Sequence, residues 1–235
     1  MGIAERLCAV RARIADACSR CGRDPAEVTV VAVAKTHGPE AVREAAEAGI
    51  EIIGENRVQE AMQKMAQCPS SLRWHMVGHL QSNKSRAAVS MFDMVHSVDS
   101  GKLLERLDRD AGDLGKRLPV CLEVNVSGER SKFGMAPDDV PPVLEAASRL
   151  RCVEVVGLMT IPPFTPEAEG ARPFFRRLRE YRDGWRNAGG MELGALSMGM
   201  SNDFDVAVEE GATIVRLGTV LFGERPRRES EGGEG

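Results

Sequence analysis

One lysine stands where a strongly apolar segment of the chain ends. Residues 30–34 read Val-Val-Ala-Val-Ala, and Lys35 follows them directly. A strand that is apolar on both faces is typical of a parallel sheet covered by helices, and such sheets place their chemistry at the carboxyl ends of the strands. An amine held in an apolar mouth is pushed toward its neutral form, which attacks carbonyl groups. Taken alone, however, a lysine at a strand end is more often a solvated surface residue.

Two segments near the end of the sequence combine small and hydroxyl-bearing residues. They are Ser197-Met198-Gly199-Met200-Ser201 and Arg216-Leu217-Gly218-Thr219. Small residues expose backbone N–H groups, so loops after the seventh and eighth strands of a barrel often bind phosphate. The alternative is that these residues merely form turns.

Together, a lysine and a phosphate site fit pyridoxal 5′-phosphate (PLP), which carries both an aldehyde and a phosphate. Arg216 is the candidate partner of the pyridine nitrogen. Its permanent charge would disfavour protonation of that nitrogen and make the cofactor a weaker electron sink.

Apolar segments alternate with amphipathic ones over nearly the whole chain. The pattern predicts strands at 28–35, 51–56, 72–79, 94–98, 120–126, 153–160, 193–198 and 214–222, with helices between them. Eight such units are the size of a single-domain (β/α)8 TIM-like barrel, here over residues 1–225. An extra helix at 3–20 is expected to cover the gap left by a missing eighth helix, and 226–235 to form a disordered tail. An open doubly wound sheet is the alternative, but no Gly-x-Gly-x-x-Gly motif follows the first strand.

Polar residues recur at or near the predicted carboxyl ends of the strands. Side chains two residues apart share a face, so Lys35 should point into the barrel with Val31 and Val33. By the same rule the inward polar residues are Asn56, His75, His79, Glu123, Asn125 and Arg216. Their coincidence at one end favours a ligand site. A zinc site built on His75 and His79 is the weaker reading, because the pattern does not fix a third ligand such as His96 or Glu123.

Composition narrows the classes of partner. The 235 residues contain 31 Lys and Arg against 35 Asp and Glu, a net charge of −4, and 4% aromatic residues. These values argue against nucleic acid as a partner. No apolar run approaches membrane-spanning length, and the start lacks a signal-peptide core. We therefore expect a cytoplasmic protein with free thiols, in which the pair Cys18 and Cys21 is only a helix end.

Several segments, in order, match one known family. They are 33–36 (VAKT), 54–60 (GENRVQE), 74–84 (WHMVGHLQSNK), 131–134 (SKFG), 157–160 (GLMT), 196–201 (LSMGMS) and 216–219 (RLGT). On these the chain resembles the pyridoxal-phosphate homeostasis proteins, a single-domain branch of the alanine-racemase-like, fold-type III group. One departure from the family pattern is His37 in the pair Thr36-His37, and the acidic tail after Arg225 also lies outside the match.

The resemblance implies PLP held as a Schiff base on Lys35, with Arg216 near the ring nitrogen. It implies phosphate contacts from Ser197, Met198, Gly199 and Ser201 and from Gly218 and Thr219, with Asn56 and His79 as further pocket residues.

The resemblance also implies a function in intracellular PLP homeostasis, by storage, buffering and delivery without clear catalytic turnover. Delivery would involve PLP-dependent apoenzymes, and we expect a monomer. Lys132 could be a second amine that receives the cofactor, although a solvated loop lysine is the simpler reading. The alternatives are a PLP-dependent amino-acid racemase and a Schiff-base aldolase that uses Lys35 and Glu123. Racemisation needs proton donors on both faces of the substrate, and the sequence offers only Lys35.

Overall fold

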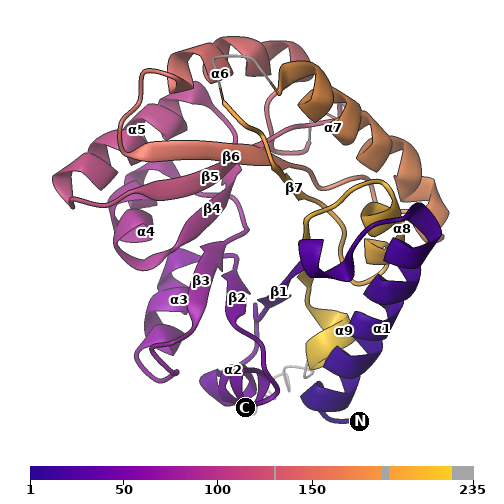
Figure 1. Ribbon diagram of the computed structural model, residues 1–235. Coiled ribbons are helices and arrows are strands. Elements are labelled where there is room, and N and C mark those ends of the chain that lie inside the picture. Colours follow the sequence, from indigo (N-terminus) through magenta and orange to yellow (C-terminus); the bar gives the residue numbers. More distant parts are fainter. Residues whose placement is uncertain (130, 187–190, 224–235) are drawn as a thin grey trace, which may run out of the picture.

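The computed structural model describes residues 1–129, 131–186 and 191–223. Parallel strands pair in sequence order, and β8 pairs with β1 to close a barrel (Figure 1). The strands are β1 (Thr29–Val33), β2 (Ile52–Glu55), β3 (Arg73–Met76), β4 (Met94–Val98), β5 (Leu118–Glu123), β6 (Val153–Met159), β7 (Ala195–Ser197) and β8 (Ile214–Leu217). The predicted (β/α)8 fold is confirmed.

Helices surround the barrel on its outside (Figure 1). They are α1 (Ile3–Cys21), α2 (Pro39–Glu47), α3 (Val58–Met65), α4 (Ser85–Met91), α5 (Gly101–Asp113), α6 (Val140–Ala147), α7 (Arg172–Trp185), α8 (Phe204–Glu209) and α9 (Thr219–Phe222). Short 3-10 turns precede β1 and three of these helices, at Pro25–Glu27, Ser82–Lys84, Pro137–Asp139 and Ala168–Ala171. None of the helices in the described residues is long and apolar enough to cross a membrane.

Strand alternation divides the apolar core into two parts. Val31 and Val33 belong to a small cluster inside the barrel, while Ala32 and Ala34 belong to the large cluster between the strands and the helices. This is the period of two that a pleated strand imposes. The inward direction predicted for Val31 and Val33 is therefore confirmed.

The N-terminal helix closes the outer ring, as predicted. Helix α1 packs against α8 and α9 and forms ion pairs with α8, Arg13 to Asp205 and Arg20 to Glu209, both at 2.6 Å. The last turn of α1 contains Cys21, and all six cysteines are free thiols. The interpretation of the cysteine pair as a helix end is confirmed.

The predicted eighth strand at 214–222 was wrong in its second half. Strand β8 ends at Leu217, and Thr219 with the three apolar residues after it forms the short helix α9. The N–H groups of Gly218 and Val220 donate to the hydroxyl of Ser201, at 3.3 and 3.2 Å, instead of to a neighbouring strand. An eighth helix is thus present, in a very short form.

The third strand was also predicted too long. Strand β3 ends at Met76, so His79 lies in the following loop rather than on the strand. A Cβ on Gly78 would lie 2.6 Å from the carbonyl oxygen of Asn56, so the two chain segments approach each other backbone to backbone and the strand geometry ends. The predicted tail at 226–235 lies outside the described residues.

Candidate functional site

Lys35 follows β1 at the mouth of the barrel. The N–H of Ala34 still donates to the Gly54 carbonyl of β2 at 3.0 Å, and the chain then turns away. The turn is closed by the N–H of His37, which donates to the Ala34 carbonyl at 3.1 Å, and it places Thr36 at a φ of 67°. A β-branched residue in this left-handed region is strained. Lys35 is half-buried, and its amine has no hydrogen-bond or ion-pair partner within the described part of the chain.

The loops after β7 and β8 are tied to each other beside Lys35. The N–H of Arg216 donates to the Gly199 carbonyl at 3.0 Å. Gly199 has a φ of 93°, and a Cβ there would lie 2.6 Å from the Cβ of Ala207. On the other side, a Cβ on Gly218 would lie 3.4 Å from the carbonyl oxygen of Val33, two residues before Lys35.

Hydrogen-bond donors remain available in these two loops. The N–H groups of Ser201 and Asn202 have no acceptor among the residues that the structure describes, and Thr219 is exposed. Unpaired amides and a hydroxyl at one place can receive an anion such as phosphate. The geometry therefore fits the predicted phosphate site.

Arg216 lies inside the barrel below these loops. Arg216 is 4% exposed, and its guanidinium donates to the hydroxyl of Ser197 at 2.7 Å and to the Thr160 carbonyl at 2.9 Å. Burial lowers the pKa of Arg216 to about 10, so the group remains charged at neutral pH. Burial also raises the pKa of Glu123 to about 7, although the positive charge of Arg216 acts in the opposite direction.

Two histidines extend this polar layer across the barrel. His75 Nδ1 lies 2.9 Å from His96 Nε2, and His96 Nδ1 lies 2.8 Å from the hydroxyl of Ser197. Burial lowers the pKa of His75 to about 4, and burial lowers that of His96 as well. Both rings are therefore neutral at pH 7 and link β3, β4, β7 and β8 through one chain of hydrogen bonds. The described residues contain no group of three or more His, Cys, Asp or Glu that could hold a metal ion.

Asn56 and His79 lie on another side of the same mouth. Both line a pocket of about 470 Å³ at the ends of β2 and β3, together with Arg57, Gln81 and Lys84. His79 Nδ1 lies 3.1 Å from an oxygen of Asp99, and its ring stacks on Phe133 with the ring centroids 3.8 Å apart. Among the described contacts, none joins His79 to Arg216.

The comparison with known proteins identifies the family of this chain. Residues 6–226 match the model of the alanine racemase N-terminal domain family. A protein of Pseudomonas aeruginosa named pyridoxal phosphate homeostasis protein is 47% identical over 224 residues, which cover 95% of this chain and 96% of that protein. The chain belongs to the pyridoxal phosphate homeostasis protein family.

Solved structures extend the family relationship. The structure of PipY from Synechococcus elongatus PCC7942 with PLP bound is 43% identical and superposes with a TM-score of 0.84, covering 94% of this chain and 100% of PipY. An alanine racemase of Clostridium difficile shares the fold alone, at 13% identity and a TM-score of 0.71, with 60% of that chain covered. The recognition of the homeostasis family from sequence is confirmed.

The structure shows the surroundings of two further residues named from the sequence, Met198 and Lys132, and two polar residues of the site were missed. The side chain of Met198 lies in the outer core, so only its backbone can face the mouth. Lys132 lies 3.8 Å from Glu129 as an ion pair in the loop after β5. Thr160 and Asp99 were missed, although Thr160 is the last residue of the predicted strand 153–160 and Asp99 directly follows the predicted strand 94–98. A polar residue at a strand end is the signal that could have found them.

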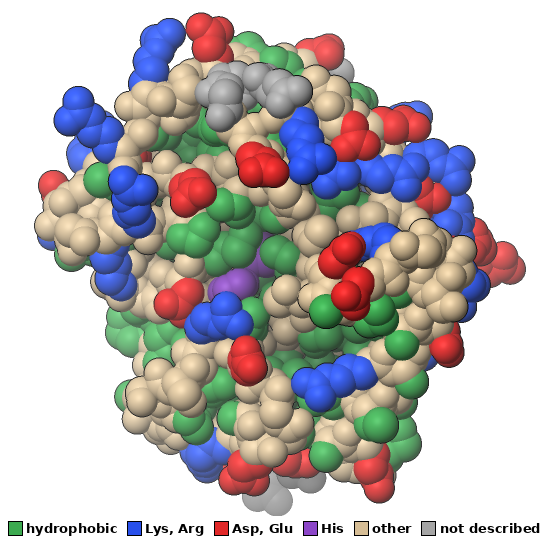
Figure 2. Space-filling model, viewed as in Figure 1, with side chains coloured by type: hydrophobic (Ala, Val, Ile, Leu, Met, Phe, Trp, Pro, Cys, Tyr) green, Lys and Arg blue, Asp and Glu red, His purple; other side chains and the backbone are tan. Residues whose placement is uncertain are grey.

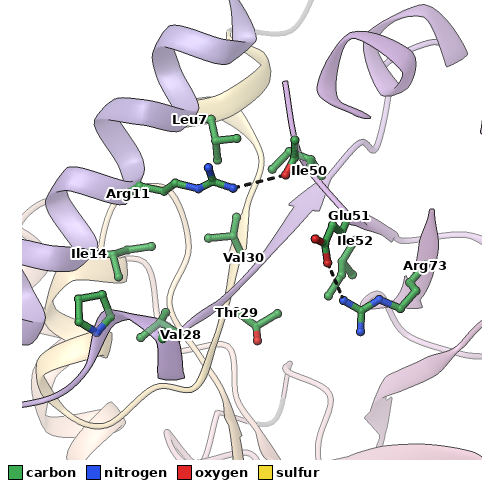
Figure 3. Close-up of a pocket in the computed structure, with 13 residues that line it drawn as sticks. Leu7, Arg11, Ile14, Val28, Thr29, Val30, Ile50, Glu51, Ile52 and Arg73 are labelled. Carbon is green, nitrogen blue, oxygen red and sulfur yellow. Dashed lines mark hydrogen bonds and ion pairs between the residues drawn. The ribbon is translucent and has the colours of Figure 1, made fainter. Parts of the chain in front are cut away.

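A second cavity of this homeostasis-family barrel lies away from the predicted site. It has a volume of about 460 Å³ and lies between α1 and the beginnings of β1 and β2 (Figure 3). Arg11 donates to the Gly49 carbonyl at its edge, and Glu51 pairs with Arg73. None of the predicted site residues lines this cavity, and this end of a barrel ordinarily serves stability.

Figure 2 shows one end of the barrel, with charged side chains both around the rim and next to the centre. In this view hydrophobic and histidine side chains lie at the centre (Figure 2). Inside the barrel, His75 and His96 are buried among the apolar side chains of the inner cluster, and this burial is what lowers their pKa values.

Proposed function

We propose that this chain holds PLP covalently through Lys35 and acts in PLP homeostasis, by storage, buffering and delivery. The observation that carries the proposal is the Lys35 amine, which is unpaired among the described residues, beside two loops with free N–H groups and a buried guanidinium, Arg216. The similarity to proteins named for PLP homeostasis and to PipY with PLP bound supports it.

The residues at the mouth fit the parts of PLP one by one. The amides of Ser201 and Asn202 and the hydroxyl of Thr219 are suited to the phosphate, and the close packing of Gly199 keeps side chains out of the loop. When bound, PLP supplies an aldehyde carbon that an amine can attack, and Lys35 is the amine at this place.

Arg216 is held in one orientation by the protein. Its bonds to Ser197 and to the Thr160 carbonyl fix the guanidinium plane, and the neutral chain of His75 and His96 braces Ser197. A fixed positive charge facing the pyridine nitrogen disfavours its protonation. Glu123 offsets part of the charge of Arg216 inside the barrel.

Three further points belong to the proposal. Transfer of PLP to apoenzymes is supported by the half-exposed position of Lys35, which an incoming amine can approach. A monomeric state is supported by the outer ring, where Met62 is the one exposed large apolar side chain among the described helices. A cytoplasmic location is supported by six free cysteines, which are typical of a reducing compartment.

The test is an absorption spectrum of the protein after incubation with PLP. We expect a band near ~420 nm, the general signature of the cofactor bound to an amine. Lys35→Ala should abolish the band, and Lys132→Ala, a loop lysine at the same end, should leave it unchanged. Borohydride reduction followed by peptide mapping should find the cofactor on Lys35.

Two results would contradict the proposal. One is the absence of a band in the wild type. The other is turnover of an added amino acid, which would replace the carrier function with that of a PLP-dependent racemase.

A further inference from the structure

A buried ion pair lies beside the turn that presents Lys35. Lys64 of α3 lies 2.6 Å from Glu55, the last residue of β2, and their side chains are 10% and 0% exposed. No other ion pair of the described residues has both side chains this deeply buried. The pair occupies the layer between the barrel and its outer helices.

The ammonium group of Lys64 makes a second contact that points to its use. It donates to the carbonyl of Ala34 at 2.7 Å, and Ala34 directly precedes Lys35. The same carbonyl accepts the N–H of His37, while the N–H of Ala34 donates to the Gly54 carbonyl. Both backbone polar groups of Ala34 are therefore engaged.

The turn beyond Ala34 needs such a support. Thr36 has a φ of 67°, a conformation that a β-branched residue keeps only when the surroundings impose it. The bond of His37 to the Ala34 carbonyl closes this turn around Lys35. A displacement of that carbonyl would therefore change the direction of the Lys35 side chain.

Stability alone is a poor explanation of the pair. Desolvation of two charges often cancels the attraction between them, and a well-packed apolar pair of similar volume is often equally stable. One carboxylate oxygen of Glu55, Oε2, is buried without a hydrogen-bond partner among the described residues. Glu55 instead holds Lys64 at the place where Lys64 reaches Ala34.

We propose that Lys64, anchored by Glu55, is a positioning residue for Lys35. It fixes the Ala34 carbonyl, and through it the strained turn at Thr36, so that the Lys35 amine points at the place where a carbonyl carbon binds. This inference rests on the proposed function, because it assigns the direction of Lys35 a use in covalent PLP binding.

The experiment separates the direction of Lys35 from binding and folding. The first variant is Lys64→Met, and the second is the double variant Glu55→Met with Lys64→Met, which leaves no unpaired buried charge and so avoids the folding loss expected of the single variant. Lys116→Met is the matched control, because Lys116 also donates to backbone carbonyls, those of Val89 and Ser90, away from β1.

Three measurements are made on each variant. Pyridoxine 5′-phosphate, which lacks the aldehyde, measures binding by the phosphate and ring sites alone. The rise of the PLP band near ~420 nm measures the covalent step at Lys35. Amide hydrogen exchange at His37 measures the turn without any cofactor.

We expect the double variant to bind pyridoxine 5′-phosphate within about twofold of the wild type but to form the covalent bond about tenfold or more slowly, since misplacement of a reacting group by about 1 Å costs up to ~100-fold. Exchange at His37 should be faster in both Lys64 variants and unchanged in Lys116→Met.

The outcomes distinguish the two proposals. Wild-type rates of both the covalent step and His37 exchange in the double variant would overturn the role of Lys64. A wild type that never gains the band would instead contradict the proposed function, and His37 exchange would still decide whether Lys64 holds the turn.

Discussion

Glu123 gives the sharpest prediction about pH, because this residue is only 5% exposed inside the barrel and burial raises the pKa of its carboxyl group to about 7. Its ordinary value is 4.5. In the unfolded chain the group ionises near 4.5, but in the folded protein it keeps its proton up to about pH 7. The contribution of Glu123 to the free energy of unfolding is therefore fully present below pH 4.5. It is lost as the pH rises from 4.5 to 7, and it does not change further above that. At about 1.4 kcal/mol per pH unit, the loss between pH 5 and pH 8 is about 3 kcal/mol.

The measurement is urea unfolding of the protein without cofactor at pH 5 and pH 8, on the wild type and on Glu123→Gln. The variant lacks the titrating group, so its free energy of unfolding should rise relative to the wild type by about 3 kcal/mol between the two pH values. His75, with a pKa near 4, destabilises the fold as the pH falls below 6.5, but it does so in both proteins and cancels in the difference.

A control and a refutation complete the design. Glu105→Gln changes an exposed carboxylate on α5, and its difference from the wild type should stay within about 0.5 kcal/mol at both pH values. If the difference between Glu123→Gln and the wild type is the same at pH 5 and pH 8, the burial argument for Glu123 is wrong.

Two further predictions concern backbone positions around the barrel. Gly199→Ala combines a φ of 93° with a Cβ only 2.6 Å from that of Ala207, so urea unfolding should show a loss of about 2 kcal/mol or more. Gly184→Ala in α7, where a Cβ meets no atom within 4 Å, should instead gain up to about 1 kcal/mol, and a loss as large as that of Gly199→Ala would contradict the reasoning. One oxygen of Asp108 accepts the N–H groups of 151–153, so Asp108→Ala should cost about 2 kcal/mol in the same assay, and an unchanged midpoint would refute this.

The inner face of the barrel could be predicted from the sequence because one physical rule controls it. The pleat of a strand forces a period of two, so Val31, Glu123 and Arg216 point inward as expected. The ends of strands follow no such rule. Residues 220–222 are apolar and suit a strand or a helix equally. The choice depends on Ser201, whose hydroxyl accepts the N–H groups of Gly218 and Val220.

Contacts between distant side chains were beyond sequence reasoning. Lys64 and Ala34 are 30 residues apart, and their hydrogen bond depends on how α3 is rotated about its axis over β2. A period of 3.6 places Lys64 on a face of the helix but does not say which strand that face meets. The same limit applies to Ser197, whose bond to Arg216 requires the register of β7 against β8.

The hydrogen bonds that hold Arg216 and the hydrogen bond of Lys64 to Ala34 act on neighbouring parts of one site. In the register of β1 and β8, Val31 pairs with Arg216, so the strand that leads to Lys35 lies beside the strand that carries the guanidinium. From inside the barrel, Ser197 and the Thr160 carbonyl hold Arg216. From outside it, Lys64 holds the peptide before Lys35.

Each arrangement buries charge at a desolvation cost that apolar residues would avoid. A ligand that is bonded at one end and held at the other needs both anchors fixed to within about 0.5 Å, and loops alone position groups less well than supported strand ends. The cost is therefore explained if the two networks exist to fix the distance and direction between the Lys35 amine and the Arg216 guanidinium. Loosening either network should then weaken covalent capture before it weakens the fold.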